Sequence, residues 1–390
     1  MDTVIAPGLR RGSATPPASK SHLHRLLIAD FLAGDRSRLA DDPADSQDIV
    51  ATKRCLRALD TDATDVTLDC GESGSTLRFM APVAAALGKR ATFRKAGRLA
   101  ARPAIEYPTL ASGRHELRGD VSSQFVTGLL FALPLLAGDS QIRFLTPLAS
   151  RGYVDMTLDV IRGAGVAIVP VEDGFDIPGG QVYRPQTATP PEGDWSGAAF
   201  WYAANAIGNR IAVEGMNADS RQPDRRILDA LPRLGGADAI DVNEFPDSFP
   251  ALAVAAACTP GTTVFTGIAR LRLKESDRVA AMADVLAKFG VRAEVADASF
   301  AVRGTDGLLH PAAPFSSFGD HRVAMATAIG ATRADAPVAI DDTACAAKSY
   351  PAFFAQFAQL KTGECAAMLP EGGSAAPRRN GICETLVDLC

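Results

Sequence analysis

Cationic and hydroxyl side chains gather at the starts of several apolar segments of this sequence, where they could bind an anion. Lys20, Ser21 and Arg25 open the first segment, and Arg322 stands at the start of the last. A helix N-terminus offers free N–H donors and a positive dipole end, so a cation there is unfavourable by about 0.3–1 kcal/mol unless an anion is bound. The pattern favours a polyanion site, although N-capping is the better explanation for any one serine alone. The remaining starts carry Glu72, Ser73, Gly74, Ser75, Thr76 and Arg78, then Ser122, Ser123 and Gln124, then Asp194, Asp247 and Asp320.

A second group of charged residues lies just before position 280. Arg270, Arg272 and Lys274 alternate with leucines, so a strand would place them on one face. Glu275 and Arg278 follow at i, i+3 spacing, which suits the first turn of a helix. A solvated charged loop is the alternative, and composition alone favours it.

Asp247 is a lone carboxylate within an apolar stretch, FPDSFP. That setting fits a positioned general base, although an aspartate that caps a helix looks the same in sequence. His22 and His24 are two residues apart, which is not the i, i+4 spacing of a chelating pair on a helix. The sequence therefore predicts acid–base chemistry on an anion and no bound metal.

Regular elements must position these residues. Six apolar, Ala-rich segments begin with polar residues and end at a glycine, which is typical of capped helices, and their apolar character all round predicts that they are buried. A second, amphipathic helix type recurs three times, each copy followed by a short β-prone run, so we expect about six α/β units. The apolar segments are residues 21–34, 73–88, 122–138, 196–208, 247–261 and 320–330, and the amphipathic copies are residues 158–165, 228–235 and 283–290.

Composition bounds the class of protein. The 390 residues are 47% hydrophobic and 22% charged, which is ordinary for a globular enzyme and long enough for two domains. A formal net charge of −5 argues against a nucleic-acid or anionic-membrane partner. No run of 18 apolar residues and no apolar N-terminal region occurs, so a cytoplasmic location is expected. The seven cysteines include no C-x-x-C pair, which favours reduced thiols over a disulfide framework or a zinc site.

Ten short motifs, in order, resemble the 5-enolpyruvylshikimate-3-phosphate (EPSP) synthase family. Any one of them is weak, but ten in order between about residues 5 and 360 are specific. The chain departs from the family at Glu72 and Arg270, where asparagine is common, and its stretch between Arg25 and Cys70 is shorter. The motifs are 17–25 (PASKSHLHR), 69–78 (DCGESGSTLR), 102–103 (RP), 119–124 (GDVSSQ), 150–153 (SRGY), 192–194 (EGD), 246–247 (PD), 274–278 (KESDR), 320–322 (DHR) and 348–351 (KSYP).

The resemblance implies an α/β fold of two similar domains. Each domain would contain three βαβαββ-type units with buried helices, an inside-out α/β barrel, and the active site would lie in the interdomain cleft. The first domain would span residues 19–191, and the second would combine residues 1–18 with 192–360. Residues 361–390 would form a tail outside the fold. A monomer is expected.

The resemblance also implies the reaction. The enolpyruvyl group of phosphoenolpyruvate would move to the 5-hydroxyl of shikimate 3-phosphate, with release of phosphate through a tetrahedral intermediate and with no cofactor. Asp247 would accept the hydroxyl proton, Glu275 would transfer a proton at the methylene carbon, and Lys274 would face the transition state, with Lys20 and Lys348 assisting. Among the matched cations, Arg78 would be structural. The residues implied for shikimate 3-phosphate are Lys20, Ser21, Arg25, Ser122, Ser123, Ser150, Tyr153, Asp247 and Lys274, and those for phosphoenolpyruvate are Lys20, Gly74, Arg102, Gln124, Arg278, Arg322 and Lys348.

Two alternatives remain open at this point. The sister enolpyruvyl transferase that acts on UDP-N-acetylglucosamine has Lys-Asn at the first motif and a catalytic cysteine near Arg102. This chain has Lys20-Ser21 instead and no cysteine in residues 94–102. The second alternative is a non-catalytic protein that keeps the anion-binding fold, although every implied catalytic residue is present.

Overall fold

The computed structural model of the chain describes residues 2–101 and 107–363. The chain divides into two compact units. Among these residues, unit 1 comprises 2–17, 193–220 and 224–363, and unit 2 comprises 18–101 and 107–192 with the short segment Arg221–Pro223. Each unit has its own apolar core, and the two are described separately below.

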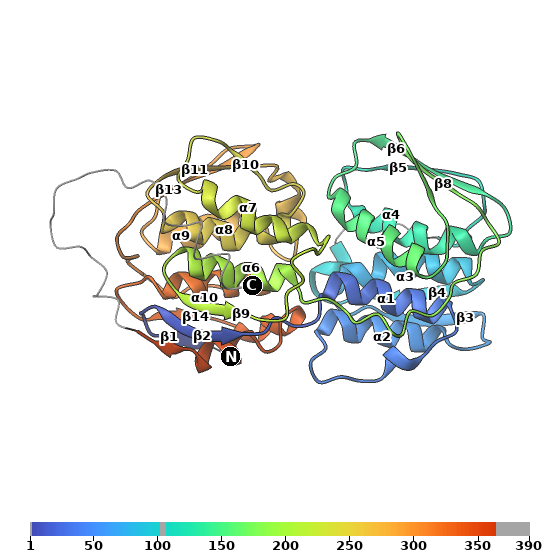
Figure 1. Cartoon of the computed structure of the whole chain (residues 1–390), viewed down its shortest axis with the longest axis horizontal. Coiled ribbons are helices and arrows are strands. Elements are labelled where there is room, and N and C mark those ends of the chain that lie inside the picture. The colour runs from blue at the N-terminus through green and yellow to red at the C-terminus, as the bar shows by residue number, and fades with distance from the viewer. Residues whose placement is uncertain (1, 102–106, 364–390) are drawn as a thin grey trace. The chain divides into compact units, whose positions relative to one another are not determined.

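Unit 2 is built around three helices with apolar surfaces on nearly all sides. Figure 1 shows these helices lying among the strands of the unit. Two small sheets accompany them, a parallel pair β3-β4 and a four-stranded sheet in the order β5-β6-β8-β7. The central helices are α1 (Lys20–Leu32), α3 (Gly74–Ala86) and α4 (Ser123–Ala132), the amphipathic ones are α2 (Gln47–Leu59) and α5 (Arg151–Gly163), and the strands are β3 (Asp65–Asp69), β4 (Arg90–Arg94), β5 (Arg114–Arg118), β6 (Ser140–Thr146), β7 (Val169–Val171) and β8 (Gly174–Ile177).

Unit 1 repeats this plan, and its described residues form three sheets, β1-β14, β10-β11-β13-β12 and β15-β2-β9. The helices labelled in this unit in Figure 1 lie between the β10–β13 strands and the strands around β2 and β9. The helices are α6 (Trp195–Ala206), α7 (Ile227–Ala230), α8 (Phe249–Ala257), α9 (Arg278–Lys288), α10 (His321–Ala331) and α11 (Phe353–Gln359). The strands are β1 (Thr3–Ile5), β2 (Arg10–Ala14), β9 (Arg210–Val213), β10 (Ile240–Asp241), β11 (Gly261–Thr266), β12 (Ala293–Val295), β13 (Ser299–Gly304), β14 (Val338–Ile340) and β15 (Lys361–Thr362).

The six buried helices form where the sequence predicts them, because each combines an apolar body with polar residues near its start. A serine or aspartate side chain caps five of them, whereas α8 has no side-chain cap. Ser73 caps α3 by accepting from the backbone N–H of Thr76, and Gly88 follows its end with φ +71°, a conformation that glycine adopts without strain. Every residue of α8 is buried, as a helix without a polar face requires. The order βαβαββ appears in full once in each unit, as β5-α4-β6-α5-β7-β8 and as β10-α8-β11-α9-β12-β13. The predicted α/β class is therefore confirmed.

The expected end of the fold at Leu360 is wrong by at least two residues. Lys361 and Thr362 form β15, which pairs antiparallel with β2 opposite Arg11 and Arg10. A two-residue strand whose partner lies about 350 positions away has no local sequence signal, so its place could not be predicted. Within residues 2–101 and 107–363, no helix is both long and apolar enough to span a membrane.

Candidate functional site

Asp247 lies at the centre of a group of cations in unit 1. It belongs to the short 3₁₀ turn Pro246–Ser248 that leads into α8. Its Oδ1 accepts from Nη1 of Arg278 at 2.7 Å and from Nζ of Lys274 at 3.3 Å, and its Oδ2 accepts from Nη2 of Arg322 at 3.0 Å. The open alternative that Asp247 caps α8 is excluded, because the residue before α8 is Ser248 and makes no side-chain cap. Its carboxylate instead accepts hydrogen bonds from three positively charged side chains.

Arg278, the first residue of α9, connects this carboxylate to two others. Its side chain is only 1% exposed, and it donates from Nη2 to Oε2 of Glu275 at 2.8 Å and from Nε to Oδ2 of Asp320 at 2.9 Å. Burial works against its charge, but Asp320, Glu275 and Asp247 outweigh burial and raise its pKa. Burial also works against the ionised form of Asp320, yet Arg278 keeps the pKa of that carboxyl below its usual value. The buried pair is therefore held in its charged form.

Arg322 approaches Asp247 from the first turn of α10. Its Nη1 lies 3.4 Å from the carbonyl oxygen of Ser196, at the start of α6. Its buried Nε has no hydrogen-bond acceptor within residues 2–101 and 107–363. A buried, unsatisfied donor is costly in a folded protein, so this part of Arg322 carries an unused hydrogen-bonding capacity.

The segment that carries Lys274 and Glu275 differs from the predicted one. Residues Ala269–Leu273 form a 3₁₀ helix rather than a strand, and Glu275 precedes α9 rather than lying on its first turn. The alternation of charge and leucine over five residues fits a tight helical turn as well as a strand. Lys274 still reaches Asp247, and burial is the main reason that its pKa is lowered.

Lys348 is the remaining predicted residue of unit 1. It is the last residue of the 3₁₀ helix Thr343–Lys348, between β14 and α11, and it is buried.

Arg270, where the chain departs from the family, contacts Asn243. It donates from Nε to Oδ1 of Asn243 at 3.2 Å and from Nη2 to the Asn243 carbonyl at 2.7 Å. Neither sequence spacing nor burial alone could have indicated the Arg270–Asn243 contact.

In unit 2, Lys20 is the first residue of α1 and pairs with a carboxylate that the sequence did not suggest. Its Nζ donates to Oδ2 of Asp48 at 2.9 Å, and both side chains are largely buried. Asp48 lies in the first turn of α2, where the helix dipole also favours its negative charge. The only sequence signal was the Ser46 cap followed by an acidic residue, which is common at helix starts.

Arg25 is almost fully buried, and it joins α1 to α5. Its Nε donates to Oγ1 of Thr157 at 2.8 Å, its Nη2 to the carbonyl of Tyr153 at 2.9 Å, and its Nη1 to the carbonyl of Ser21. Within the described part of the chain no carboxylate forms an ion pair with it, and burial lowers its pKa to about 10. Ser150, which precedes α5, is buried and has a left-handed backbone with φ +55°. The structure thus brings Ser21, Arg25 and Tyr153 together.

The starts of α3 and α4 are connected by Gln124. Its Oε1 accepts from Nη1 of Arg78 at 2.6 Å, and its Nε2 donates to Oγ of Ser75 at 2.8 Å, next to Gly74. Arg78 also stacks on Phe125, at 5.2 Å from the ring centre, which fits the structural role expected for it. Ser122 caps α4 through the backbone N–H of Gln124, and Ser123 is the first helical residue.

Two further positions complete the predicted set. Glu72 packs against Gly97, where an added Cβ would lie 2.3 Å from Oε1 of Glu72. Gly97 has φ +51°, so glycine serves both the turn and this close approach. Arg102 lies outside the described residues.

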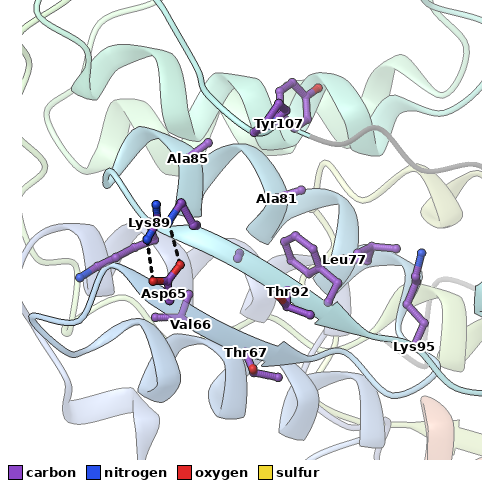
Figure 2. A pocket seen from close by; sticks show the side chains of 14 residues that line it. Asp65, Val66, Thr67, Leu77, Ala81, Ala85, Lys89, Thr92, Lys95 and Tyr107 are labelled. Atoms are coloured by element: carbon purple, nitrogen blue, oxygen red, sulfur yellow. Dashed lines mark hydrogen bonds and ion pairs between the residues drawn. The ribbon is translucent and has the colours of Figure 1, made fainter.

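A cavity of about 600 Å³ on unit 2 contains none of the predicted site residues (Figure 2). One face of α3 (Leu77, Ala81, Ala85) and strands β3 and β4 line it. Lys89 and Lys95 lie toward different parts of its rim, and Asp65 is paired with Arg90 at 2.7 Å (Figure 2). This cavity is therefore distinct from the place where the predicted residues of unit 2 gather.

Known proteins resemble this chain over nearly its whole length. A sequence model of EPSP synthase (3-phosphoshikimate 1-carboxyvinyltransferase) matches residues 100–239 and 235–357. The 3-phosphoshikimate 1-carboxyvinyltransferase of Clostridium kluyveri is 36% identical, covering 91% of this chain and 96% of that protein. The chain belongs to the EPSP synthase family. The corresponding protein of Clostridium acetobutylicum is 35% identical with the same coverage.

Solved structures of low sequence identity have the same fold. The EPSP synthase of Acinetobacter baumannii superposes with a TM-score of 0.70 at 21% identity, covering 92% of this chain and 97% of that one. The enolpyruvyl transferase NikO of Streptomyces tendae superposes with a TM-score of 0.62 at 15% identity, covering 93% and 97%. The fold is the two-domain inside-out α/β barrel of the EPSP synthase family, with the buried helices described above.

Proposed function

We propose that this protein transfers the enolpyruvyl group of phosphoenolpyruvate to the 5-hydroxyl of shikimate 3-phosphate. The hydroxyl oxygen adds to C2 of phosphoenolpyruvate while C3 gains a proton, which gives a tetrahedral intermediate. Loss of a proton from C3 and of phosphate from C2 then leaves the enolpyruvyl ether. The enzyme would serve the biosynthesis of aromatic compounds by the shikimate pathway.

The observation that carries this proposal is the Asp247 cluster in a chain of this family. Asp247 contacts Lys274, Arg278 and Arg322 at 2.7–3.3 Å, and these cations stabilise its ionised form. A carboxylate so held is a weak proton acceptor. We infer that phosphoenolpyruvate takes over Arg278 and Arg322 through its phosphate and carboxylate groups. Asp247 then regains basicity when both substrates are bound, which restricts proton removal to the productive complex.

Glu275 and Lys274 are suited to the second proton. Glu275 is paired with Arg278 at 2.8 Å. When phosphoenolpyruvate takes over Arg278, the carboxylate of Glu275 would become free to exchange a proton with C3. Burial already lowers the pKa of Lys274, so this side chain releases a proton more readily than an ordinary lysine. While it is charged, the ammonium group can stabilise negative charge in the transition state. Lys20 and Lys348 would add positive charge around the phosphate that leaves.

Shikimate 3-phosphate would bind at the starts of α1, α4 and α5 in unit 2. Ser21, Ser122, Ser123 and Ser150 would supply hydroxyl and backbone donors, which suit phosphate at helix N-termini. Tyr153 would lie against the ring. Arg25 would contribute mainly as the buried cation that organises Ser21 and Tyr153, because its donors already point to their carbonyls. Gly74 and Gln124 would meet phosphoenolpyruvate, together with Arg102.

We also propose that the enzyme acts as a monomer in the cytoplasm and needs no metal. Its four described cysteines, Cys55, Cys70, Cys258 and Cys345, are free thiols, which agrees with a reducing compartment.

The deciding experiment is phosphate release from phosphoenolpyruvate by the purified protein. Release should require shikimate 3-phosphate, should not occur with UDP-N-acetylglucosamine, and should persist in EDTA. The organic product should carry one enolpyruvyl ether by mass spectrometry. Phosphate release that does not depend on shikimate 3-phosphate, or the absence of any release, would reject the proposed activity.

A further inference from the structure

A short segment outside the family motifs contacts the start of α1. Residues Arg221–Pro223 group with unit 2, although the chain on both sides of them groups with unit 1. Gln222, in the middle, is buried. Its Oε1 accepts from Oγ of Ser19 at 2.8 Å, and its Nε2 donates to Oε2 of Glu192 at 3.0 Å. This amide orientation is required, because the reverse would place its oxygen against the carboxylate of Glu192.

Ser19 is the residue through which Gln222 acts on α1. It is the N-cap of the helix, and its hydroxyl accepts from the backbone N–H of His22 while it donates to Gln222. Its own backbone N–H donates to the carbonyl of Glu192 at 2.6 Å. Ser19 is therefore held by hydrogen bonds to Gln222 and to the backbone of Glu192. Because Ser21 follows two residues later in the same helix, its position depends on this cap.

The neighbours of Gln222 contact α5, which follows Ser150 and holds Tyr153 in its first turn. A Cβ placed on Gly152 would lie 2.7 Å from Cγ of Pro223, so the proline ring packs directly on this turn. Arg221 contacts α5 further along the helix, where its Nε lies 3.3 Å from Oδ2 of Asp159. Gln222 and Pro223 thus contact two of the three helix starts that carry the proposed shikimate 3-phosphate residues, those of α1 and α5.

We propose that Gln222 is a positioning residue for shikimate 3-phosphate, with Pro223 as its support on α5. The proposal rests on the proposed function. Gln222 fixes the Ser19 cap, and Pro223 fixes the turn at Gly152, so Ser21 and Tyr153 keep their spacing before the substrate arrives. Lys20 depends less on this segment, because Asp48 holds its ammonium group independently. Binding of shikimate 3-phosphate should therefore suffer more than binding of phosphoenolpyruvate.

The first test is Gln222→Ala, with each Michaelis constant measured at saturation by the other substrate. Loss of a buried hydrogen bond to a charged group should raise KM for shikimate 3-phosphate about tenfold. The turnover number and KM for phosphoenolpyruvate should change less than about twofold. Gln222→Glu, which places a second carboxylate against Glu192, should have at least as large an effect on the same constant.

Gln186→Ala is the matched control. Gln186 is another glutamine of unit 2 whose Nε2 bonds to α5, at the carbonyl of Val160 at 2.8 Å, but near the other end of the helix. Its loss should lower the thermal midpoint as Gln222→Ala does while leaving KM for shikimate 3-phosphate unchanged. This comparison separates positioning from general destabilisation.

A second pair of variants tests the support without touching Gln222. Gly152→Ala should push Pro223 away and raise KM for shikimate 3-phosphate, because the new Cβ overlaps the ring. Adding Pro223→Ala removes Cγ, and the nearest remaining proline atom, Cβ, lies at 3.4 Å, so the double variant should recover most of the affinity. A double variant worse than Gly152→Ala would contradict the proposed contact.

The outcomes distinguish the positioning role from the activity itself. A wild-type protein without shikimate-dependent phosphate release overturns the proposed function and the positioning role with it. An active wild type with an unchanged KM for shikimate 3-phosphate in Gln222→Ala overturns the positioning role alone. So does a Gln222→Ala variant in which both Michaelis constants rise equally, as general loosening of the unit would produce.

Discussion

Nη1 of Arg278 donates to Oδ1 of Asp247 at 2.7 Å, and this contact joins two charge clusters into one. On one side of it lie Lys274 and Arg322, and on the other lie Glu275 and Asp320. Three carboxylates thus face three cations, and the network is close to neutral. We therefore expect an arriving anion to replace a carboxylate in this network. Asp247, which contacts all three cations, is the carboxylate it would replace.

Asp247→Asn should separate binding from catalysis. The amide keeps the shape of the side chain but removes the negative charge that competes with an anion for the three cations. Inorganic phosphate and phosphoenolpyruvate should therefore bind about tenfold more tightly, which corresponds to roughly 1.4 kcal/mol of binding free energy. Turnover should fall by about 10²–10⁴, the usual cost of removing a general base. Isothermal titration and steady-state kinetics measure the two effects.

Asp30→Asn is the control for Asp247→Asn. Asp30 is another buried aspartate with an arginine partner, Arg38 at 2.6 Å, but it lies away from the proposed site in unit 2. Its replacement should cost stability and leave turnover intact. Weaker phosphate binding by Asp247→Asn would contradict the replacement of Asp247 by the anion.

Asp320→Asn should destabilise unit 1 through charge alone. Asparagine can still cap α10, but it leaves Arg278 buried without its close partner, which typically costs about 3–5 kcal/mol. Asp277→Asn is the matched control, because Asp277 caps α9 in the same way and is partly exposed. Both tryptophans, Trp195 and Trp201, lie in unit 1, so their fluorescence in urea follows this unit. Equal losses in the two variants would contradict the buried-pair explanation.

Lys274→Arg should move the alkaline limit of activity. Burial, the main cause, lowers the pKa of Lys274 below the ordinary value of 10.5, so its charge is lost as pH rises through that lowered pKa. If the cation serves the transition state, kcat/KM falls over the same range. Arginine stays charged there, so the variant should be slower at neutral pH but hold its rate to higher pH. An alkaline limb that does not move would remove Lys274 from this role.

Lys288→Arg is the matched control for Lys274→Arg. Lys288 lies on α9 in the same unit and pairs with Asp284 at 2.8 Å, outside the Asp247 cluster. Its replacement should leave both the rate and the pH profile of kcat/KM unchanged between pH 6 and 10.

The sequence predicts what is local and misses what is assembled at a distance. A polar start and an apolar body are contained within one segment, so all six buried helices are predictable. A glycine with positive φ follows α1, α3 and α6, whereas Gly330 lies inside α10. The Asp247–Arg278 contact joins residues 31 positions apart, and only the packing of α8 against α9 decides it. A cation at a helix start needs an anion, which predicts a binding role for Lys20, yet the structure provides Asp48 there, which no motif indicates.

His24→Phe should reduce the acid sensitivity of unit 2. His24 is fully buried in α1, where Nδ1 bonds to Oγ1 of Thr52 at 2.8 Å and the ring packs edge-on against Phe79. Burial, chiefly, lowers its pKa from 6.5 to about 3, because the favourable charge of Asp48 is opposed by Lys20 and Arg25. Between these values the unfolded chain takes up a proton that the folded chain does not, so stability falls as pH drops.

The expected size of this effect follows from the pKa difference. Proton uptake by the unfolded chain should lower the free energy of unfolding of wild type by about 2 kcal/mol at pH 5 relative to neutral pH. His24→Phe should not show this loss. Tryptophan fluorescence would miss it, because both tryptophans lie in unit 1, so hydrogen exchange of α1 peptides at pH 7.5 and 5, corrected for intrinsic rates, is the proper measurement. His24→Gln, polar but not titrating, should behave like His24→Phe. Variants that lose as much protection as wild type on acidification would show that His24 is not the group responsible.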